Sequence, residues 1–167
     1  MSDIYGSLYQ TLQPSRYAVK RKEGPETPNA TLIGLGLAWE THLEKVLVQA
    51  GINAQRPGEF RTKEGIIFSP DLLIDNGVTR LGEIKLTRYA MTGDYRDERF
   101  AKWMTQCKAY CYHLETPYAT LLALHVGGNY REVRDPTLVI TELEFTPREL
   151  RDEWERLLRH AQEQRML

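Results

Sequence analysis

The chain has 167 residues, 41% of them hydrophobic and 27% charged, with a net charge of −1 and a pI of about 6.4. This length fits one domain with its own core, and the charge excludes a strongly basic protein that coats nucleic acid. No window approaches the ~18–20 apolar residues of a membrane span, and the N-terminus does not have the pattern of a signal peptide. We therefore expect a cytoplasmic protein.

Residues 1–30 are expected to form an irregular N-terminal arm, followed by a single domain over residues 31–167. Prolines at positions 14, 25 and 28 interrupt regular structure in the arm. The basic cluster Lys20-Arg21-Lys22 could contact a DNA backbone, although a solvent-exposed arm is the simpler explanation.

Residues 32–50 are predicted to form a helix, because apolar residues recur there at spacings of three and four. Gly51 is expected to end this helix. Two carboxylates, Glu40 and Glu44, lie one turn apart and face the same way. The predicted apolar stripe consists of Leu35, Trp39, Leu43, Val46, Leu47 and Ala50.

The next segments are predicted to be hairpins. A short one spans residues 60–68, and a longer one pairs residues 71–75 with 78–87 across Asn76-Gly77, a sequence typical of a type I′ turn with φ > 0 at both residues. Glu83 and Lys85 share one face of their strand, and the hairpin would bring Asp71 beside them. Two carboxylates and a lysine on one patch can hold a divalent cation and a water beside a phosphate.

The second half of the chain predicts a polar loop over 88–97, a helix over 98–115, strands over 118–126 and 137–145, and a final helix. Thr146-Pro147-Arg148-Glu149 has the pattern of an N-cap, a proline at the first helical position and a capping-box glutamate. This order of elements indicates a mixed α/β sandwich, with a central sheet flanked by helices. The apolar stripe of the helix over 98–115 consists of Phe100, Trp103, Met104, Cys107, Cys111 and Leu114.

Four short motifs follow one another between residues 36 and 110, about half of the chain. In this order they resemble the motifs of the PD-(D/E)XK nuclease superfamily, in its RecB-like and lambda-exonuclease-like branch. The resemblance implies a restriction-endonuclease-like αβββαβ core with a mixed central sheet flanked by helices. The motifs are Gly36-x-x-x-Glu40, Pro70-Asp71, Glu83-Ile84-Lys85 and Gln106-x-x-x-Tyr110.

The resemblance also implies a deoxyribonuclease that depends on Mg²⁺ or Mn²⁺. Glu40, Asp71, Glu83 and the backbone carbonyl of Ile84 would bind the metal, and Lys85 would position or deprotonate the attacking water. Hard cations of this kind prefer oxygen ligands. We prefer Glu40 to Glu44 because Glu40 completes the GxxxE motif.

Further residues are candidates for contact with DNA. In the family, the pair corresponding to Gln106 and Tyr110 lies near the active site and helps to orient the DNA and the catalytic groups. Arg88, Arg96 and Arg99 follow the EXK strand and could contact phosphates, although a solvent-exposed loop explains them equally well.

Two cysteines, Cys107 and Cys111, are too few for a structural zinc site or an iron–sulfur cluster. Some RecB-like nucleases carry a four-cysteine cluster, and this chain departs from them. We expect both cysteines to be small buried apolar residues. His125, at the end of an apolar strand, is expected to be a core or edge histidine.

Exonuclease action on the ends of linear DNA is the preferred function, and it depends on the QxxxY resemblance. A structure-specific or restriction-type endonuclease acting as a dimer is the alternative. A non-catalytic nucleic-acid-binding module is the third. The short chain suggests a stand-alone nuclease of the kind found in phages and mobile elements, with a role in DNA recombination or repair. The sequence leaves open whether it forms a homo-oligomer or works with a recombination or helicase partner.

Overall fold

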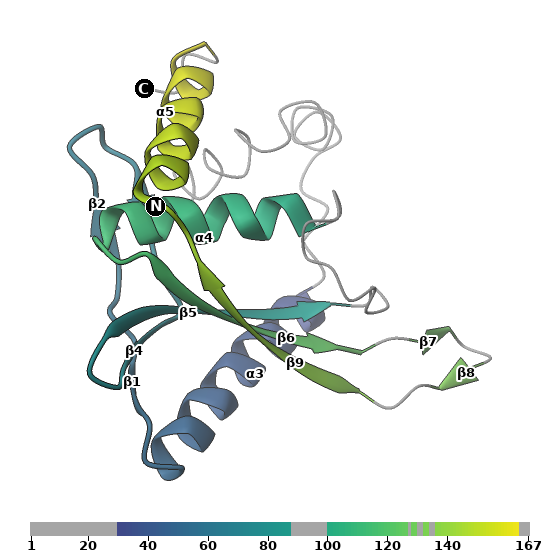
Figure 1. Ribbon diagram of the computed structural model, residues 1–167. Coiled ribbons are helices and arrows are strands. Elements are labelled where there is room, and N and C mark those ends of the chain that lie inside the picture. The colour runs from purple at the N-terminus through teal and green to yellow at the C-terminus, as the bar shows by residue number, and fades with distance from the viewer. Residues whose placement is uncertain (1–29, 88–99, 127, 130–131, 134–135, 164–167) are drawn as a thin grey trace.

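The computed structural model describes residues 30–87, 100–126, 128–129, 132–133 and 136–163 (Figure 1). Most of the expected arm, including Lys20-Arg21-Lys22, lies outside these residues. So does the segment that carries Arg88, Arg96 and Arg99. Within the described part of the chain, no helix has the length and apolar character that a membrane crossing requires.

A mixed sheet forms the centre of the molecule. In the described residues five strands lie in the spatial order β1-β4-β5-β6-β9. β5 and β6 are parallel, and the other neighbours are antiparallel. The sheet confirms the predicted mixed α/β fold. The bounds are Asn53–Gln55 for β1, Leu72–Asp75 for β4, Thr79–Thr87 for β5, Tyr118–His125 for β6 and Thr137–Glu144 for β9.

In the part of the chain that the structure describes, two short strand pairs lie outside this sheet. β2 (Phe60–Arg61) pairs with β3 (Ile67–Phe68), which confirms the first predicted hairpin. β7 (Gly128–Asn129) pairs with β8 (Glu132–Val133), a hairpin that the sequence did not predict. The edge strand β1 of the central sheet was also missed, because it is three residues long and only Ala54 is buried. Such a strand has no measurable alternation.

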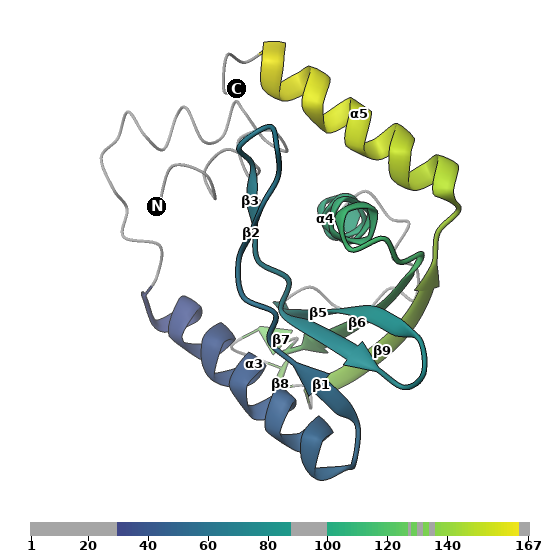
Figure 2. The ribbon, with the colours of Figure 1, turned by 90° about the vertical axis from the view of Figure 1, so that its left-hand side faces the viewer.

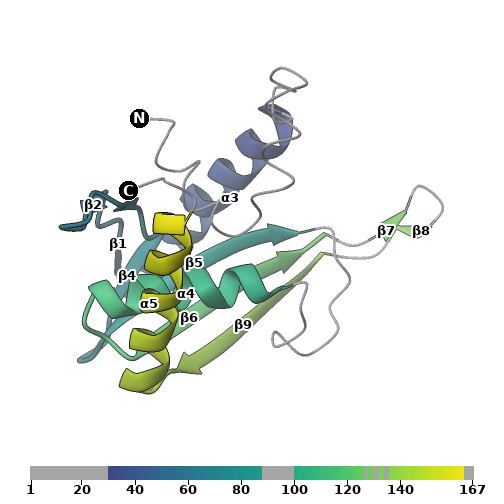
Figure 3. The ribbon, with the colours of Figure 1, turned by 90° about the horizontal axis from the view of Figure 1, so that it is seen from above.

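The helices cover both faces of the sheet. α3 (Ala30–Gln49) lies on one face, and α4 (Ala101–His113) lies on the other (Figure 2). α5 (Pro147–Glu163) lies on the far side of α4 from the sheet and crosses it when seen from above (Figure 3). α4 falls in the chain between the parallel strands β5 and β6, which require a crossover connection of this kind.

The helix α3 buries a narrower stripe than its sequence predicts. Leu43 is buried against the sheet, with Trp39 and Leu47 partly buried one turn to either side. Leu35 and Val46, which belonged to the predicted stripe, are exposed. Leu35, Trp39, Leu43 and Leu47 form one i, i+4 line, but only the last three pack in this cluster. Leu35 lies one turn before the contact begins, and Val46 lies beside the line. The sheet residues of this cluster are Ala54, Leu72, Ile74, Ile84 and Leu122.

Gly51 ends α3 as predicted. Its φ is +80°, a value that glycine adopts without strain. The Ile52 amide donates to the Leu47 carbonyl and the Gly51 amide to the Val48 carbonyl, both at 3.0 Å. These two bonds form a Schellman motif, in which a left-handed glycine satisfies the last carbonyls of the helix.

The other face of the sheet packs on α4. Cys107 and Cys111 are fully buried free thiols in this core, beside Leu81 and Ala119. Burial raises the pKa of both thiols, that of Cys111 to about 12. They are therefore un-ionised apolar side chains, as predicted. His125 is also buried, with its ring edge-on to Phe100.

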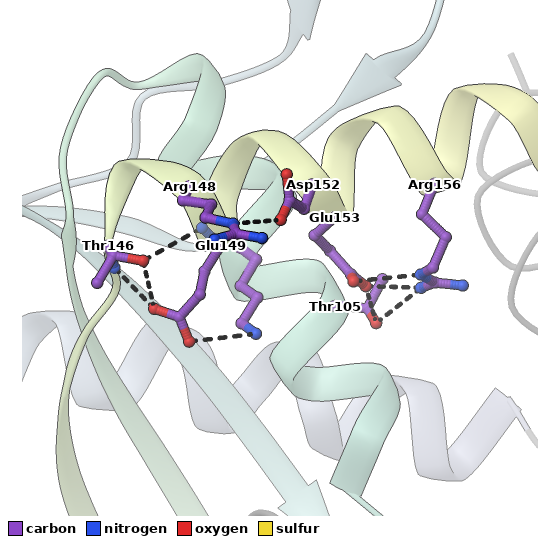
Figure 4. A network of polar contacts seen from close by, with 8 residues as sticks. Thr105, Thr146, Arg148, Glu149, Asp152, Glu153 and Arg156 are labelled. Carbon is purple, nitrogen blue, oxygen red and sulfur yellow. Dashed lines mark hydrogen bonds and ion pairs between the residues drawn. The ribbon is translucent and has the colours of Figure 1, made fainter.

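Polar contacts cap the N-terminus of α5 and join this helix to α4 (Figure 4). The Thr146 amide donates to Glu149 Oε2 at 2.8 Å, and the Glu149 amide donates to Thr146 Oγ1 at 3.2 Å. This is the predicted capping box. Further along the helix, Glu153 Oε1 accepts hydrogen bonds from Thr105 Oγ1 of α4 and from Arg156, each at 2.6 Å. α4 is thus held between the sheet and α5.

The β4–β5 hairpin is confirmed, but the predicted type I′ turn is wrong. Asp75 pairs with Thr79, so the loop has three residues. Among the described non-glycine residues, Glu115 alone has a positive φ, so Asn76 does not adopt the conformation that a type I′ turn needs. Gly77 has a φ of +95°, and its amide donates to Asp75 Oδ1 at 3.0 Å. The side chain of Asp75 thus stabilises a different turn.

Gly82 packs where a side chain does not fit. A Cβ atom there would lie 2.9 Å from Leu72 Cβ and 3.1 Å from Ile74 Cδ1. We expect Gly82→Ala to lower the free energy of unfolding by about 1–3 kcal/mol, the usual cost of overpacking. Urea unfolding followed by circular dichroism measures this. Gly36→Ala is the control. A Cβ atom at this position of α3 has no atom within 4 Å, and alanine favours a helix more than glycine does, so the free energy of unfolding should rise by about 0.5–1 kcal/mol. Equal stability of the Gly82→Ala variant and the wild type would contradict the packing.

Candidate active site

The first part of the site is the contact between the start of β4 and the middle of β5. Asp71 directly precedes β4, and the pairing of Leu72 with Gly82 continues the register so that Asp71 lies beside Glu83. The Ile84 amide donates to Asp71 Oδ2 at 2.8 Å. This side-chain hydrogen bond extends the β4–β5 pairing past its last backbone pair, Leu72 and Gly82. It fixes the carboxylate of Asp71 beside the backbone of Glu83 and Ile84.

A chain of hydrogen bonds then leads from β5 to α4. Glu83 and Lys85 share the face that packs on α4, and Lys85 Nζ donates to Glu83 Oε1. Lys85 Nζ also donates to Gln106 Oε1 at 3.0 Å, and Gln106 Nε2 donates to Tyr110 Oη at 3.1 Å. The structure therefore joins residues of the EXK and QxxxY motifs by direct contact.

These side chains differ in their access to solvent. Glu83 is 0% exposed, whereas the side chain of Lys85 is 18% exposed. Tyr110 is 3% exposed and its ring stacks on Phe68 with 5.3 Å between the centroids. The expected DNA contact by Tyr110 does not fit this burial. Its hydroxyl instead orients Gln106, which is half-buried and points its carbonyl oxygen at Lys85.

α3 contributes Glu40 from the other side. Arg56, which follows β1, lies between the two acidic residues of this helix: its Nε is 2.8 Å from Glu44 Oε2, and its Nη1 is 3.6 Å from Glu40 Oε2. Glu40 interacts electrostatically with Asp71, Lys85 and Glu83. The structure thus brings Glu40 near the strand carboxylates and pairs Glu44 closely with Arg56.

The pKa values of the three carboxylates are raised. Burial raises the pKa of Glu83 to about 8, with Lys85 opposing the shift and the Asp71 and Glu40 carboxylates adding to it. Burial also raises the pKa of Asp71, against the effects of Lys85, the Ile84 amide and Arg56. The pKa of Glu40 is raised by burial and then by Asp71. Clustered carboxylates that ionise reluctantly are typical of a site that binds a cation.

Lys85 is a charged donor in this arrangement. Its burial disfavours the ammonium form, but the carboxylates of Glu83 and Asp71 outweigh burial and raise its pKa. A lysine that deprotonates a water beside a bound cation would need a lowered pKa. In the described structure Lys85 instead holds its proton between Glu83 and Gln106.

The carboxylates of this site are candidate ligands for a divalent metal. Among the described residues, no three His, Cys, Asp or Glu side chains converge closely enough to hold an ion as they stand. Glu83 Oε2, however, is buried and has no hydrogen-bond partner. An orphaned carboxylate oxygen in a core is costly, and with Asp71 nearby it offers the oxygen ligands that Mg²⁺ and Mn²⁺ prefer. The donor set therefore fits a hard cation.

None of the sequence motifs includes Arg56. It stands in a segment without a motif, between Gln55 and Pro57, and its approach to Glu40 arises from the packing of α3 on β1. Arg88, Arg96 and Arg99, expected to contact DNA, lie outside the described residues. Of the remaining candidates, the structure brings together Glu40, Asp71, Glu83, Ile84, Lys85, Gln106 and Tyr110.

Comparison with known proteins identifies the fold. No family model and no curated protein sequence matches the chain. Among solved structures, an alkaline exonuclease (LHK-Exo) from Laribacter hongkongensis is similar, with a TM-score of 0.55 and 17% identity over 88% of this chain and 75% of that one. The crystal structure of SSO0001 is also similar, with a TM-score of 0.54 and 18% identity over 94% of this chain and 73% of that one. The chain thus shares its fold with these two proteins, and this fold confirms the predicted mixed central sheet flanked by helices.

Proposed function

We propose that this protein is a deoxyribonuclease that depends on Mg²⁺ or Mn²⁺ and acts most readily on the ends of linear DNA. The observation that carries this proposal is the contact chain Asp71–Ile84, Glu83–Lys85 and Lys85–Gln106, built on a nuclease fold. Each of the four motifs contributes a residue to this one cluster. Four unrelated short motifs would not be expected to meet at one place in the fold.

Asp71 and Glu83 would hold the metal, with Glu40 as a third carboxylate and the Ile84 carbonyl as a further oxygen ligand. When bound, a divalent metal acts as a Lewis acid on the phosphate and as a template for in-line attack. With all groups ionised, the four carboxylates of Glu40, Glu44, Asp71 and Glu83 exceed the two cations, Lys85 and Arg56, by two charges. A divalent cation bound beside Asp71 and Glu83 would offset this excess.

Lys85 would act on the reacting phosphate directly. Hydrolysis joins a water oxygen to phosphorus and breaks the bond to the leaving 3′ oxygen, and negative charge grows on the phosphoryl oxygens as this happens. A fixed ammonium group stabilises that charge, and Lys85 is fixed by Gln106. Gln106 is in turn oriented by Tyr110, so the QxxxY pair would position the lysine.

The preference for linear ends rests on the QxxxY resemblance and on the structural similarity to a protein described as an alkaline exonuclease. DNA as the substrate is proposed on the same grounds. Action within circular or branched DNA, as by an endonuclease, remains the alternative outcome of the experiment below.

The test uses end-labelled linear duplex DNA and matched covalently closed circular DNA, each incubated with protein in Mg²⁺, Mn²⁺ or EDTA. We expect loss of the linear DNA with either metal, no loss in EDTA, and an intact circle. Nicking of the circle would replace the exonuclease assignment with the endonuclease one. No metal-dependent cleavage of either substrate would contradict the proposed enzyme.

A further inference from the structure

Arg56 is a charged residue of the site that none of the motifs includes. Its side chain is 38% exposed, and its guanidinium lies between two carboxylates of α3. It also acts electrostatically on Asp71, at the start of β4. Arg56 therefore stands at the solvent-accessible edge of the carboxylate cluster.

The two contacts of the guanidinium are unequal. Nε donates a hydrogen bond to Glu44 Oε2 at 2.8 Å, whereas Nη1 is 3.6 Å from Glu40 Oε2, beyond hydrogen-bond distance. Arginine has five N–H donors in a planar fork, and the bond to Glu44 occupies one of them. Glu44 thus anchors the guanidinium through Nε, and Nη1 lies near Glu40 without a hydrogen bond to it.

A purely structural role explains this arrangement poorly. Arg56, Glu40 and Glu44 are all partly exposed, and ion pairs in such positions contribute little to stability. A planar, permanently charged fork is, by contrast, well suited to bind a phosphate through two parallel hydrogen bonds.

We propose that Arg56 is a phosphate-binding residue, which contacts the non-bridging oxygens of a DNA backbone phosphate beside Asp71, and that Glu44 positions it. This inference rests on the proposed function for the identity of the substrate. It also assigns different roles to the two acidic residues of α3: Glu40 would bind the metal, and Glu44 would position Arg56.

The test measures DNA binding without cleavage. A fluorescent duplex is titrated in EDTA with wild type, Arg56→Ala, Arg56→Lys, Glu44→Gln and the control Arg151→Ala, over about 50–200 mM salt. Arg151 is exposed on α5, on the opposite side of the sheet from α3. Circular dichroism and the melting temperature establish that each variant is folded.

We expect Arg56→Ala to weaken binding about tenfold and to reduce the slope of log K against log salt by about one, the effect of losing one phosphate contact. Arg56→Lys should keep the slope and lose part of the affinity, because lysine keeps the charge without the fork. Glu44→Gln should weaken binding less than Arg56→Ala, and Arg151→Ala should match the wild type. An unchanged affinity and slope in a folded Arg56→Ala protein would overturn the proposal.

A second readout separates phosphate binding from support of the metal ligand. Mn²⁺ binding, followed by electron paramagnetic resonance, should be unchanged or tighter in Arg56→Ala, because a cation beside the carboxylates has been removed. Weaker Mn²⁺ binding would instead make Arg56 a positioning residue for Glu40, and would overturn its assignment to phosphate.

The inference and the proposed function can fail separately. If the wild type cleaves no DNA but Arg56→Ala still loses affinity and slope, the phosphate contact stands and the enzyme assignment falls. If the wild type cleaves DNA and Arg56→Ala binds like the wild type, the phosphate contact alone falls. Absence of wild-type binding in both EDTA and Mn²⁺ would overturn both.

Discussion

A Lys85→Ala variant is expected to lose metal-dependent DNA cleavage by at least about 100-fold, the effect of removing a fixed group that stabilises charge in a transition state. The ammonium of Lys85 is held on two sides, by Glu83 and Gln106. Water replacing it would have neither its charge nor its fixed position. The loss should appear mainly in kcat, because the contact strengthens as charge grows on the phosphate.

The variant should remain folded at neutral pH. Removing one partner of a buried ion pair is usually destabilising, because it leaves an unpaired charge. Glu83 can avoid this by keeping its proton, since burial already raises its pKa to about 8. Circular dichroism and the melting temperature should therefore be close to those of the wild type below this pH.

Lys108→Ala is the matched control for this experiment. Lys108 lies two residues from Gln106 on the same helix, but its ammonium is directed at Glu149, 3.9 Å away, and at the ring of Phe145. Its removal should leave the cleavage rate unchanged. The measurement is single-turnover digestion of end-labelled duplex at saturating protein. If Lys85→Ala cleaves at the wild-type rate, the catalytic group has been misassigned.

The parts of the fold that were predicted correctly are those with local causes. The capping box at Thr146 and Glu149 is one example, because four consecutive residues contain both partners of its hydrogen bonds. The end of α3 at Gly51 is another, since the left-handed conformation needs one residue type. The helices follow from apolar periodicity, and β6 follows from a mostly apolar run of eight residues.

The incorrect predictions concern features whose conformation is determined by tertiary packing or by a neighbouring side chain. The turn at Asn76-Gly77 has the dipeptide of a type I′ turn, but the neighbouring carboxylate of Asp75 binds the Gly77 amide and favours another geometry. The exposure of Leu35 and Val46 depends on how the sheet meets α3, which no helical pattern contains. β1 forms by antiparallel pairing with the edge of β4 opposite β5, which the sequence of β1 alone does not indicate.

The same distinction applies to the site. Spacing along β5 predicts that Glu83 and Lys85 share a face, and the structure confirms it. The hydrogen bond from Lys85 to Gln106 joins residues 21 positions apart, and only the crossover of α4 over β5 creates it. The motif resemblance indicated Gln106 but not its partner, and it did not indicate Arg56.

Glu83 should make the stability of the metal-free protein fall as pH rises. Burial raises the pKa of Glu83 from its ordinary value of 4.5 to about 8, so the folded state binds this proton more tightly than the unfolded chain does. The stabilisation is complete below about pH 4.5 and is lost progressively as pH rises to about 8. Each pH unit between the two values corresponds to about 1.4 kcal/mol, so the effect amounts to several kcal/mol.

A Glu83→Gln variant removes this dependence, because the amide is uncharged at every pH and close to the protonated carboxyl in shape. In EDTA, its melting temperature should fall less than that of the wild type between pH 5 and 8.5, and should exceed the wild-type value at the upper end. Asp71 and Glu40, whose pKa values are also raised, leave the variant some residual decline. The exposed residue Glu144 gives the control, since Glu144→Gln should follow the wild type.

Bound metal should oppose the loss of wild-type stability at high pH. A cation must displace the proton of Glu83, so Mg²⁺ should raise the wild-type melting temperature more at pH 8.5 than at pH 6. The increase follows from binding to the folded state alone. Glu83→Gln should lose most of it, because the orphaned Oε2 and its charge are gone. Differential scanning fluorimetry with and without Mg²⁺ measures both effects. Equal protection of the wild type and Glu83→Gln would locate the metal elsewhere in the chain, and identical pH profiles in EDTA would contradict the buried carboxyl itself.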